Sequence, residues 1–173
     1  MKFSNKCLLA AIALVGLASS ANAQATATAN ASATIVTPIS IVNNADMNFG
    51  NIAVQTATGG TVALTASAAP TRTAGGAGGV TLPNVTGTVT SAKFTVSGTA
   101  NYTYTITLPG SAVVLSSGAN NMNATAFINS AAGTLSGTGS QIFYVGATLT
   151  VAAAQAAGVY TTATPFNVTV NYN

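Results

Sequence analysis

The sequence predicts an all-β protein, an antiparallel β-sandwich of about nine or ten short strands. Apolar residues alternate with Thr, Ser or Asn in many short runs, most clearly at the end of the chain, where Phe166, Val168, Val170 and Tyr172 share one parity. Side chains of a strand point to opposite faces in turn, so this pattern is typical of a half-buried strand. Gly, Pro and Asn separate the runs, and no segment carries a convincing helical pattern.

Residues 1–23 have the features of a secretory signal peptide. A positively charged start precedes an apolar run from Leu8 to Leu17, and a small-residue cleavage site ends at Ala23. The apolar run is too short to span a membrane, and no longer one follows. We therefore expect an exported protein that begins at Gln24, with no membrane insertion.

Very little charge remains once this segment is removed. The charged side chains are then Arg72, Lys93 and Asp46, two cations and one anion, which leaves a net charge of +1. Nucleic-acid binding requires clustered Lys and Arg, so that function is excluded. Hydrophobic residues make up 49% of the chain, which argues against disorder. A surface with so little charge permits close contact between copies.

Residues 24–34 are predicted to be extended. Alanine occupies every odd position from 25 to 33, Thr, Asn or Ser occupies the even positions after Gln24, and Ile35 continues the apolar parity. Alanine buries little area, so the segment is either a flexible leader or a strand that needs another sheet's edge or groove. The candidate donor residues are Ala25, Ala27, Ala29, Ala31, Ala33 and Ile35.

Residues 35–173 are predicted to form a single sandwich domain. A strand is expected over residues 34–42, where Pro38 indicates a sheet edge or a kink. Residues 61–66 alternate and predict another strand. Residues 67–79, rich in Ala, Gly and Thr, are expected to be a long surface loop that holds Arg72.

The second half of the chain has the clearest strand patterns. Residues 92–97 and 102–108 alternate on either side of a short turn, which predicts a hairpin. Residues 141–151 are apolar on both parities in part, as expected of a central strand covered on both faces. The run 152–157 is too short for a stable helix and is expected to be a loop or a single turn.

The mature chain lacks the usual groups of catalytic and metal sites. After residue 23 there is no His, Glu, Cys or Trp, and Asp46 is the one carboxylate side chain. Paired carboxylates, a Ser-His-Asp triad and zinc or calcium ligand sets all need more than this. Ser91 and Lys93 would lie side by side on an outer strand face, without the buried lysine that activates a serine. We expect no enzyme activity, no metal and no cofactor.

Five tyrosines could line a sugar site by stacking. Most of them fall on the apolar parity, which favours core positions with the hydroxyl group reaching the rim. They are Tyr102, Tyr104, Tyr144, Tyr160 and Tyr172.

Several motifs occur in an order that resembles a bacterial family known as domain of unknown function 4402. They are Ile39–Ile41, Met47–Ile52, Gly79–Leu82, Ala92–Gly98, Tyr102–Ile106, Val145–Val151, Gly158–Tyr160 and Phe166–Tyr172. The resemblance covers nearly the whole mature chain and implies an exported β-sandwich.

A wider resemblance is to fimbrial and spore-coat-U-like subunits of the chaperone–usher type. These end in an alternating strand with an upstream glycine and a penultimate aromatic residue, as Gly158 and Tyr172 do here. The resemblance implies an immunoglobulin-like or pilin-like sandwich, exported through the periplasm to the surface of a Gram-negative bacterium. A periplasmic chaperone, an usher and related or identical subunits would be its partners.

The function expected from these patterns is that of a secreted structural subunit of a surface fibre, pilus or extracellular matrix. Subunits would assemble by β-strand addition, with the alternating N-terminal segment as donor. The candidate acceptor is a groove beside Gly158, Phe166, Val168, Val170 and Tyr172. Two alternatives remain: a non-catalytic, adhesin-like module that binds surface glycan through loops such as 67–79, and a monomer whose N-terminal strand closes its own sheet.

Overall fold

The computed structural model describes residues 24–173, and the predicted signal peptide, residues 1–23, lies outside them. The chain divides into a unit that ends at Ile35 and a folded unit, Val36–Asn173. Regular structure in the described residues consists of strands alone, so no helix there is able to cross a membrane. The strands pair in antiparallel fashion and form a sandwich-like fold, which confirms the predicted all-β class.

Residues 24–35 contain no strand. Every residue of this segment is exposed, and Ile35 is 97% exposed. The strand expected over residues 34–42 begins only at Ser40, because β1 comprises Ser40–Ala45. Pro38, which has no N–H group, precedes it, and β1 forms an edge of its sheet, as the proline indicated.

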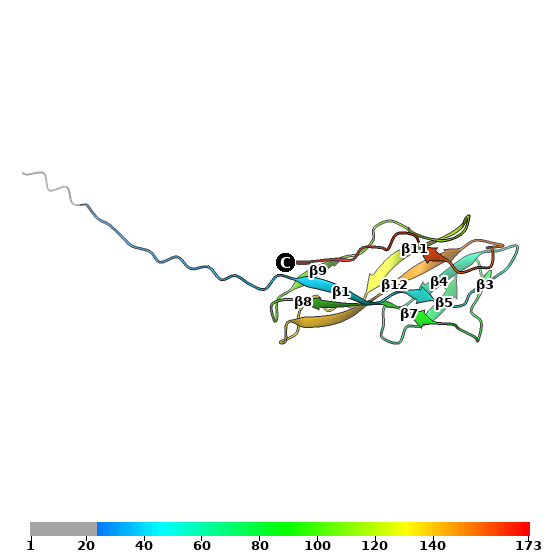
Figure 1. Ribbon diagram of the computed structural model, residues 1–173, viewed down its shortest axis with the longest axis horizontal. Coiled ribbons are helices and arrows are strands. Elements are labelled where there is room, and N and C mark those ends of the chain that lie inside the picture. The colour runs from blue at the N-terminus through cyan, green and yellow to red at the C-terminus, as the bar shows by residue number, and fades with distance from the viewer. Residues whose placement is uncertain (1–23) are drawn as a thin grey trace, which may run out of the picture. The chain divides into compact units, whose positions relative to one another are not determined.

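The main sheet is built around β12 (Ser140–Val151), the longest strand. One edge of β12 pairs with β11 (Asn120–Asn129). The other edge pairs first with β8 (Ala92–Ser97) and then with β4 (Gly60–Leu64), so two strands share one side and the sheet curls (Figure 1). This arrangement confirms the central strand predicted over residues 141–151.

Four shorter strands complete the main sheet. β1 pairs with β8, and β10 (Val113–Ser117) pairs with β11 and with β13 (Thr161–Thr162). β5 (Arg72–Gly75) pairs with β4, so the prediction of a long surface loop over residues 67–79 is wrong for residues 72–75, which include Arg72. β5 lies on the edge, where backbone hydrogen bonds hold a strand that has no apolar alternation to reveal it.

Three short ladders form the second layer. β9 (Tyr104–Thr107) pairs with β14 (Thr169–Tyr172). β2 (Asn48–Phe49) pairs with β7 (Val89–Thr90), and β3 (Ala53–Val54) pairs with β6 (Val80–Thr81). The residues described hold fourteen strands, more than the nine or ten expected, because five of them (β2, β3, β6, β7 and β13) are only two residues long.

The hairpin predicted from residues 92–97 and 102–108 is wrong. β8 pairs with β1 and β12 in the main sheet, whereas β9 pairs with β14 in the second layer. The turn between them therefore carries the chain from one layer to the other. Asn101 adopts a positive φ of 63° in this turn, and a side chain at Gly98 would collide with the Tyr172 hydroxyl group. Alternation reports which face is buried and not which strand is the neighbour.

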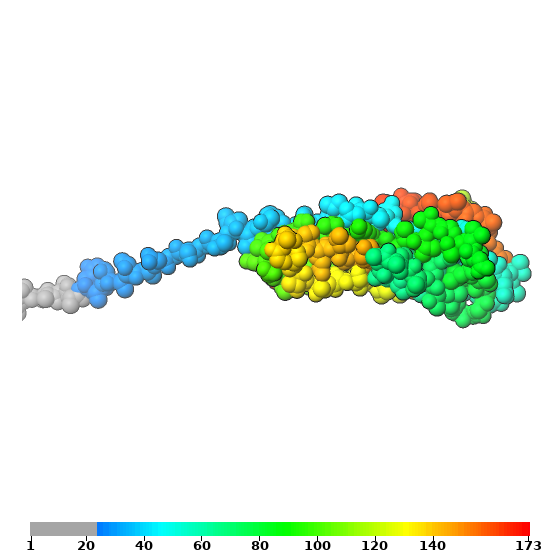
Figure 2. Space-filling view, turned by 90° about the horizontal axis from the view of Figure 1, so that it is seen from below, coloured from blue at the N-terminus to red at the C-terminus, as the bar shows by residue number. Residues whose placement is uncertain are grey.

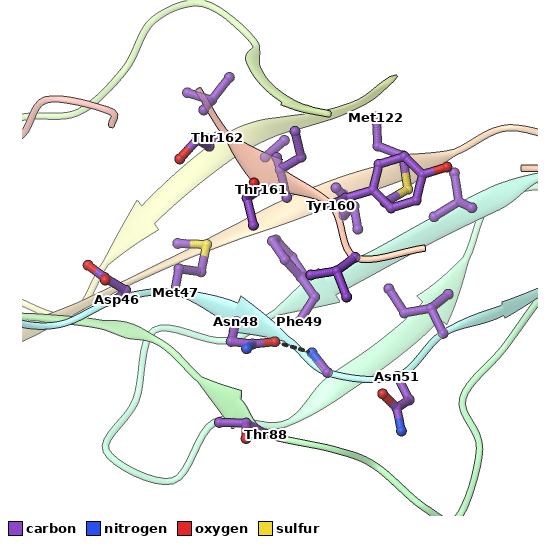
Figure 3. Close-up of a pocket in the computed structure, with 18 of the residues that line it drawn as sticks. Asp46, Met47, Asn48, Phe49, Asn51, Thr88, Met122, Tyr160, Thr161 and Thr162 are labelled. Carbon is purple, nitrogen blue, oxygen red and sulfur yellow. Dashed lines mark hydrogen bonds between the residues drawn. The ribbon is translucent and has the colours of Figure 1, made fainter. Parts of the chain in front are cut away.

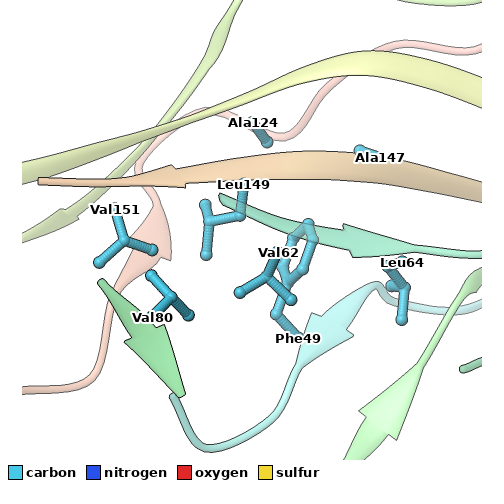
Figure 4. Close-up of a cluster of buried hydrophobic side chains, with 8 residues drawn as sticks. All are labelled: Phe49, Val62, Leu64, Val80, Ala124, Ala147, Leu149 and Val151. Carbon is cyan, nitrogen blue, oxygen red and sulfur yellow. The ribbon is translucent and has the colours of Figure 1, made fainter. Parts of the chain in front are cut away.

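Two apolar clusters fill the space between the layers. The first joins β4 and β12 of the main sheet to Phe49 and Val80 of the second layer (Figure 4). The second joins β8 and β12 to Tyr104 and Val170, and the rings of Phe94 and Phe143 stack within it at 5.4 Å. Each fully buried side chain of this kind stabilises the fold by roughly 1.5–3 kcal/mol.

Candidate functional site

An open groove of about 1150 Å³ lies where the second layer is incomplete. One wall is the segment 46–54, and the other is the segment 155–166, which approach each other along one rim of the folded unit (Figure 2). β2 pairs only with β7, β3 pairs only with β6, and β13 pairs with β10 among the described residues. Within residues 24–173 no strand fills the space between these walls.

The floor of the groove is apolar and comes from the inner face of the main sheet. Leu149 and Val151 of β12 and Ala124 of β11 are buried beneath it. Met122 and Phe127 of β11 are half-buried, so parts of their side chains face the open groove. A floor of this composition favours an apolar or small side chain above it.

The first wall is shaped by an interruption of the strand pattern. Met47 and Phe49 rise from this wall into the groove, and Met122 and Tyr160 line it as well (Figure 3). Gly50 then adopts a φ of 68°, and a side chain there would collide with the carbonyl oxygen of Thr86. The turn at Gly50 requires glycine for both reasons.

Arg72 holds this wall in place from β5. Its Nη1 atom donates hydrogen bonds to the carbonyl oxygens of Phe49 and Asn51, each over 2.7 Å. The backbone N–H of Asn51 also donates to the carbonyl oxygen of Thr86 over 2.7 Å. A guanidinium group offers several donors in a rigid plane, so one side chain fixes both carbonyls around the turn.

The second wall is held by Gln155 and Tyr160. The Nε2 atom of Gln155 donates to the backbone carbonyl of Asn121 over 3.2 Å and to the Tyr160 hydroxyl group over 2.9 Å. That hydroxyl donates to the carbonyl oxygen of Ala156 over 2.7 Å. The segment therefore forms turns and no helix, as the sequence predicted for residues 152–157.

Charge is almost absent from the groove. Asp46 is the one charged side chain among its described lining residues, and the Nδ2 atom of Asn43 donates to its carboxylate over 2.8 Å. Among residues 24–173 no three His, Cys, Asp or Glu side chains come together as metal ligands would. The groove thus offers apolar contact and strand edges for binding.

The predicted acceptor residues divide between two places. Gly158 and Phe166 line the groove, and the Phe166 ring lies 5.2 Å from that of Phe127. Val168, Val170 and Tyr172 instead pack into the second apolar cluster, since β14 pairs with β9. The predicted donor residues, the alanines at 25 to 33 and Ile35, are exposed in the unit that ends at Ile35.

Tyr172 takes part in a cluster that we call the clasp, formed by Thr37, Thr99 and Tyr172. The Tyr172 hydroxyl group accepts a hydrogen bond from the backbone N–H of Thr99 over 2.6 Å and donates one to the carbonyl oxygen of Thr37 over 2.8 Å. The N–H of Thr37 donates to Oγ1 of Thr99 over 3.0 Å. The hydroxyl of a half-buried tyrosine thus reaches the rim, as expected from the sequence.

Sequence reasoning missed most of the groove. Met47, Phe49, Met122 and Leu149 line it from three separated segments, and none of the four was predicted as part of a site. The one signal that could have indicated this wall is Arg72. In a chain with so few charges, its guanidinium group has almost no carboxylate to pair with and must donate hydrogen bonds to backbone carbonyl groups instead.

Comparison with known proteins gives one match. The model of a family described as domain of unknown function (DUF4402) matches residues 39–172, nearly the whole folded unit. Neither the curated proteins nor the solved structures include a match to the chain.

Proposed function

The chain belongs to the DUF4402 family, as its motifs indicated, and from its groove we propose that it is a secreted structural subunit of a bacterial surface fibre, pilus or extracellular matrix. Subunits assemble when an extended segment of one copy enters the groove of the next. The observation that carries this proposal is an apolar floor exposed between two walls that no strand of residues 24–173 joins.

A strand suits this groove better than a compact ligand. An inserted strand forms backbone hydrogen bonds along the edges of β2 and β3, and these give affinity whatever the side chains are. Its inward side chains cover Leu149, Met122 and Phe127. The same insertion protects edges that otherwise invite aggregation.

Residues 24–35 are the donor. They are exposed, and their apolar residues alternate with polar ones, as an inserted strand requires. Twelve extended residues span about 40 Å, and the eight residues of the wall 47–54 span about 26 Å. Most of the affinity comes from backbone pairing, since alanine contributes little buried area.

The likeness of the chain to chaperone–usher subunits extends the proposal to its partners. A protein with an exposed apolar groove needs a cover during export, which a periplasmic chaperone provides by strand addition. The absence of charged side chains from residues 24–35 makes donation insensitive to salt, because no ion pair is formed or broken.

Removal of the donor tests the proposal. The mature protein, beginning at Gln24, should form oligomers or fibres in negative-stain microscopy and sedimentation, and a variant without residues 24–34 should be a soluble monomer. A variant in which a Gly/Ser segment of equal length replaces residues 24–34 controls for chain length and should also be monomeric. Undiminished fibres from either variant would contradict the proposal, and glycan binding by the monomer would favour an adhesin-like module instead.

A further inference from the structure

The outer face of the main sheet, which points away from the second layer, carries exposed apolar side chains. Val42 of β1 is 58% exposed, and Ile142 of β12 is 52% exposed. The two strands flank β8, so these side chains belong to one stretch of the sheet (Figure 1). An antiparallel sheet with one face in water normally presents polar residues there.

The strand register places these side chains in one row. Val42 pairs with Thr95 of β8, and Thr95 pairs with Ile142. The hydroxyl group of Thr95 donates to Oδ1 of Asn44 over 2.7 Å, so the polar group at the centre is bonded within the molecule. Side chains directly opposite each other on neighbouring strands lie about 5 Å apart, so the three form a continuous strip. We call this strip the apolar row, and contiguous exposed apolar groups of this kind mark interaction surfaces.

A row of a different kind lies on each side of the apolar row, two residues further along the strands. On one side are Lys93 and Tyr144, which pair with each other. On the other side are three serines, Ser40, Ser97 and Ser140, which pair in the same way. Lys93 is the one charged side chain in the three rows.

The three rows are complementary to themselves under a two-fold rotation. An axis along the apolar row sets that row against itself in a second copy, and it sets the lysine row of each copy against the serine row of the other. Packed sheets lie about 10 Å apart and these rows about 6.8 Å apart, so the two lysines would be roughly 17 Å from each other. Their repulsion is screened, because the Debye length is about 8 Å. Each ammonium group instead meets serine hydroxyl groups, which accept its hydrogen bonds.

A single contact of this size is too small to hold two molecules together. Three strands by three rows cover about 14 Å by 20 Å, or roughly 300 Å² on each copy. A stable interface takes about 800 Å² from each partner. Two fibres that lie side by side repeat the contact along their length, and repeated contacts bind far more tightly than one.

We propose that the outer face of β1, β8 and β12 joins neighbouring fibres side by side, by pairing of the apolar row with the same row of a second copy. This inference rests on the proposed function, because it requires fibres. It concerns a different surface, since the groove floor is the inner face of the same sheet. Both surfaces are therefore available at the same time.

Charge on the apolar row tests this proposal. Fibres of the unaltered mature protein should form bundles, which are seen by negative-stain microscopy and sediment at low speed. Ile142→Glu should give single fibres, because pairing would bury two carboxylates against each other. Val42→Glu tests the other end of the row and should have the same effect. Val114→Glu is the matched control and should bundle normally, since Val114 is 46% exposed on β10, which β11 separates from β12.

Mixing fibres of opposite charge identifies the partner. Ile142→Lys fibres should also stay single. A mixture of preformed Ile142→Glu fibres and Ile142→Lys fibres should form bundles at low salt and separate at high salt. This result requires a partner that presents position 142 of the same chain.

Four outcomes would overturn the proposal or what it rests on. Bundles formed by either Glu variant, single fibres of the unaltered protein, or a mixture that stays single would each contradict pairing of the apolar row. Fibres are present in all three cases, so the proposed function would stand. Absence of fibres from the unaltered protein would overturn the proposed function, and this inference with it.

Discussion

The hydroxyl group of Tyr172 donates a hydrogen bond to the carbonyl oxygen of Thr37 over 2.8 Å, although the two residues are 135 positions apart in the chain. This contact joins the last strand of the fold to the residue that leads into the first. Both ends of the folded unit are thereby fixed at one place, and the groove opens elsewhere.

Tyr172→Phe should lower the free energy of unfolding by about 1–2 kcal/mol, because it removes the hydrogen bonds of the hydroxyl group to the carbonyl oxygen of Thr37 and from the N–H of Thr99. Urea denaturation measures the change. Tyr102→Phe is the control, since that ring is 44% exposed and packs edge-on against Tyr172. An equal loss in both variants would contradict the role given to the Tyr172 hydroxyl.

Arg72→Met should destabilise the fold by about 1–3 kcal/mol and weaken binding of the 24–35 peptide. The substitution keeps the aliphatic stem but loses the two charge-assisted hydrogen bonds that hold the wall at Phe49 and Asn51. Lys93→Met removes the other cation of the mature chain and should change neither property by more than about 0.5 kcal/mol. Peptide affinity by titration calorimetry separates the two variants, and equal peptide affinity in both would count against Arg72 as the clamp of the wall.

Met122→Glu should abolish assembly and leave the isolated fold largely intact. Met122 is half-buried on the groove floor, so a carboxylate there stays hydrated until an inserted strand covers it. Ile128→Glu, on the same strand at a position 51% exposed and outside the groove, is the matched control. Sedimentation should show a monomer for the first variant and unchanged oligomers for the second. Assembly of the Met122 variant would argue against the groove as the acceptor.

Leu149→Ala should cost about 2–5 kcal/mol, because Leu149 is 1% exposed beneath the groove and its truncation leaves a cavity in the first apolar cluster. Thermal or urea unfolding measures the loss. A loss below about 1 kcal/mol would mean that the floor collapses onto the vacant space and that this part of the core is not packed as described.

Stability should also fall at high pH because of Tyr104. Burial of this side chain, which is 2% exposed and hydrogen-bonded to the amide of Gln141, raises its pKa above the usual 10.0. The folded state then resists ionisation more than the unfolded state does. Its contribution is complete below pH 10 and is lost as the pH rises from there toward the folded pKa. Tyr104→Phe should reduce the fall of the urea unfolding midpoint between about pH 9 and pH 11. An unchanged dependence of the midpoint on pH would contradict the role given to Tyr104.

The sequence was sufficient to predict the fold class, the central strand β12 and the family. Apolar residues on both parities of residues 141–151 indicate burial on both faces, and that inference needs no knowledge of the neighbours. The hairpin failed because alternation in residues 92–97 and 102–108 is equally compatible with strands of different layers. β5 was not predicted because an edge strand that is held by backbone hydrogen bonds needs no alternating apolar residues.

The groove could not be predicted for a related reason. It is a gap between elements, and a gap has no residues of its own to form a pattern. Its wall changes parity at Gly50, so Phe49 and Ile52 face the same space from positions that alternation assigns to opposite sides. The patterns that indicated assembly were those of the predicted donor segment, residues 24–35, and of the predicted acceptor, of which Gly158 and Phe166 line the groove.

Disulfide capture between two copies tests strand addition most directly, because the mature chain has no cysteine of its own. One variant carries Met122→Cys on the groove floor. Its partner carries cysteine at one odd donor position, with Ala25, Ala27, Ala29, Ala31 and Ala33 tested in turn. Cysteines bond only when their Cβ atoms approach to about 4 Å, so a bond reports the facing residues.

On mixing and mild oxidation, we predict a disulfide-linked dimer of the two variants for at least one odd position, with little product from Thr28→Cys or Asn30→Cys, which lie on the opposite parity. Equal yields at odd and even positions, or no linked dimer at any position, would contradict the claim that the groove receives this segment from another copy.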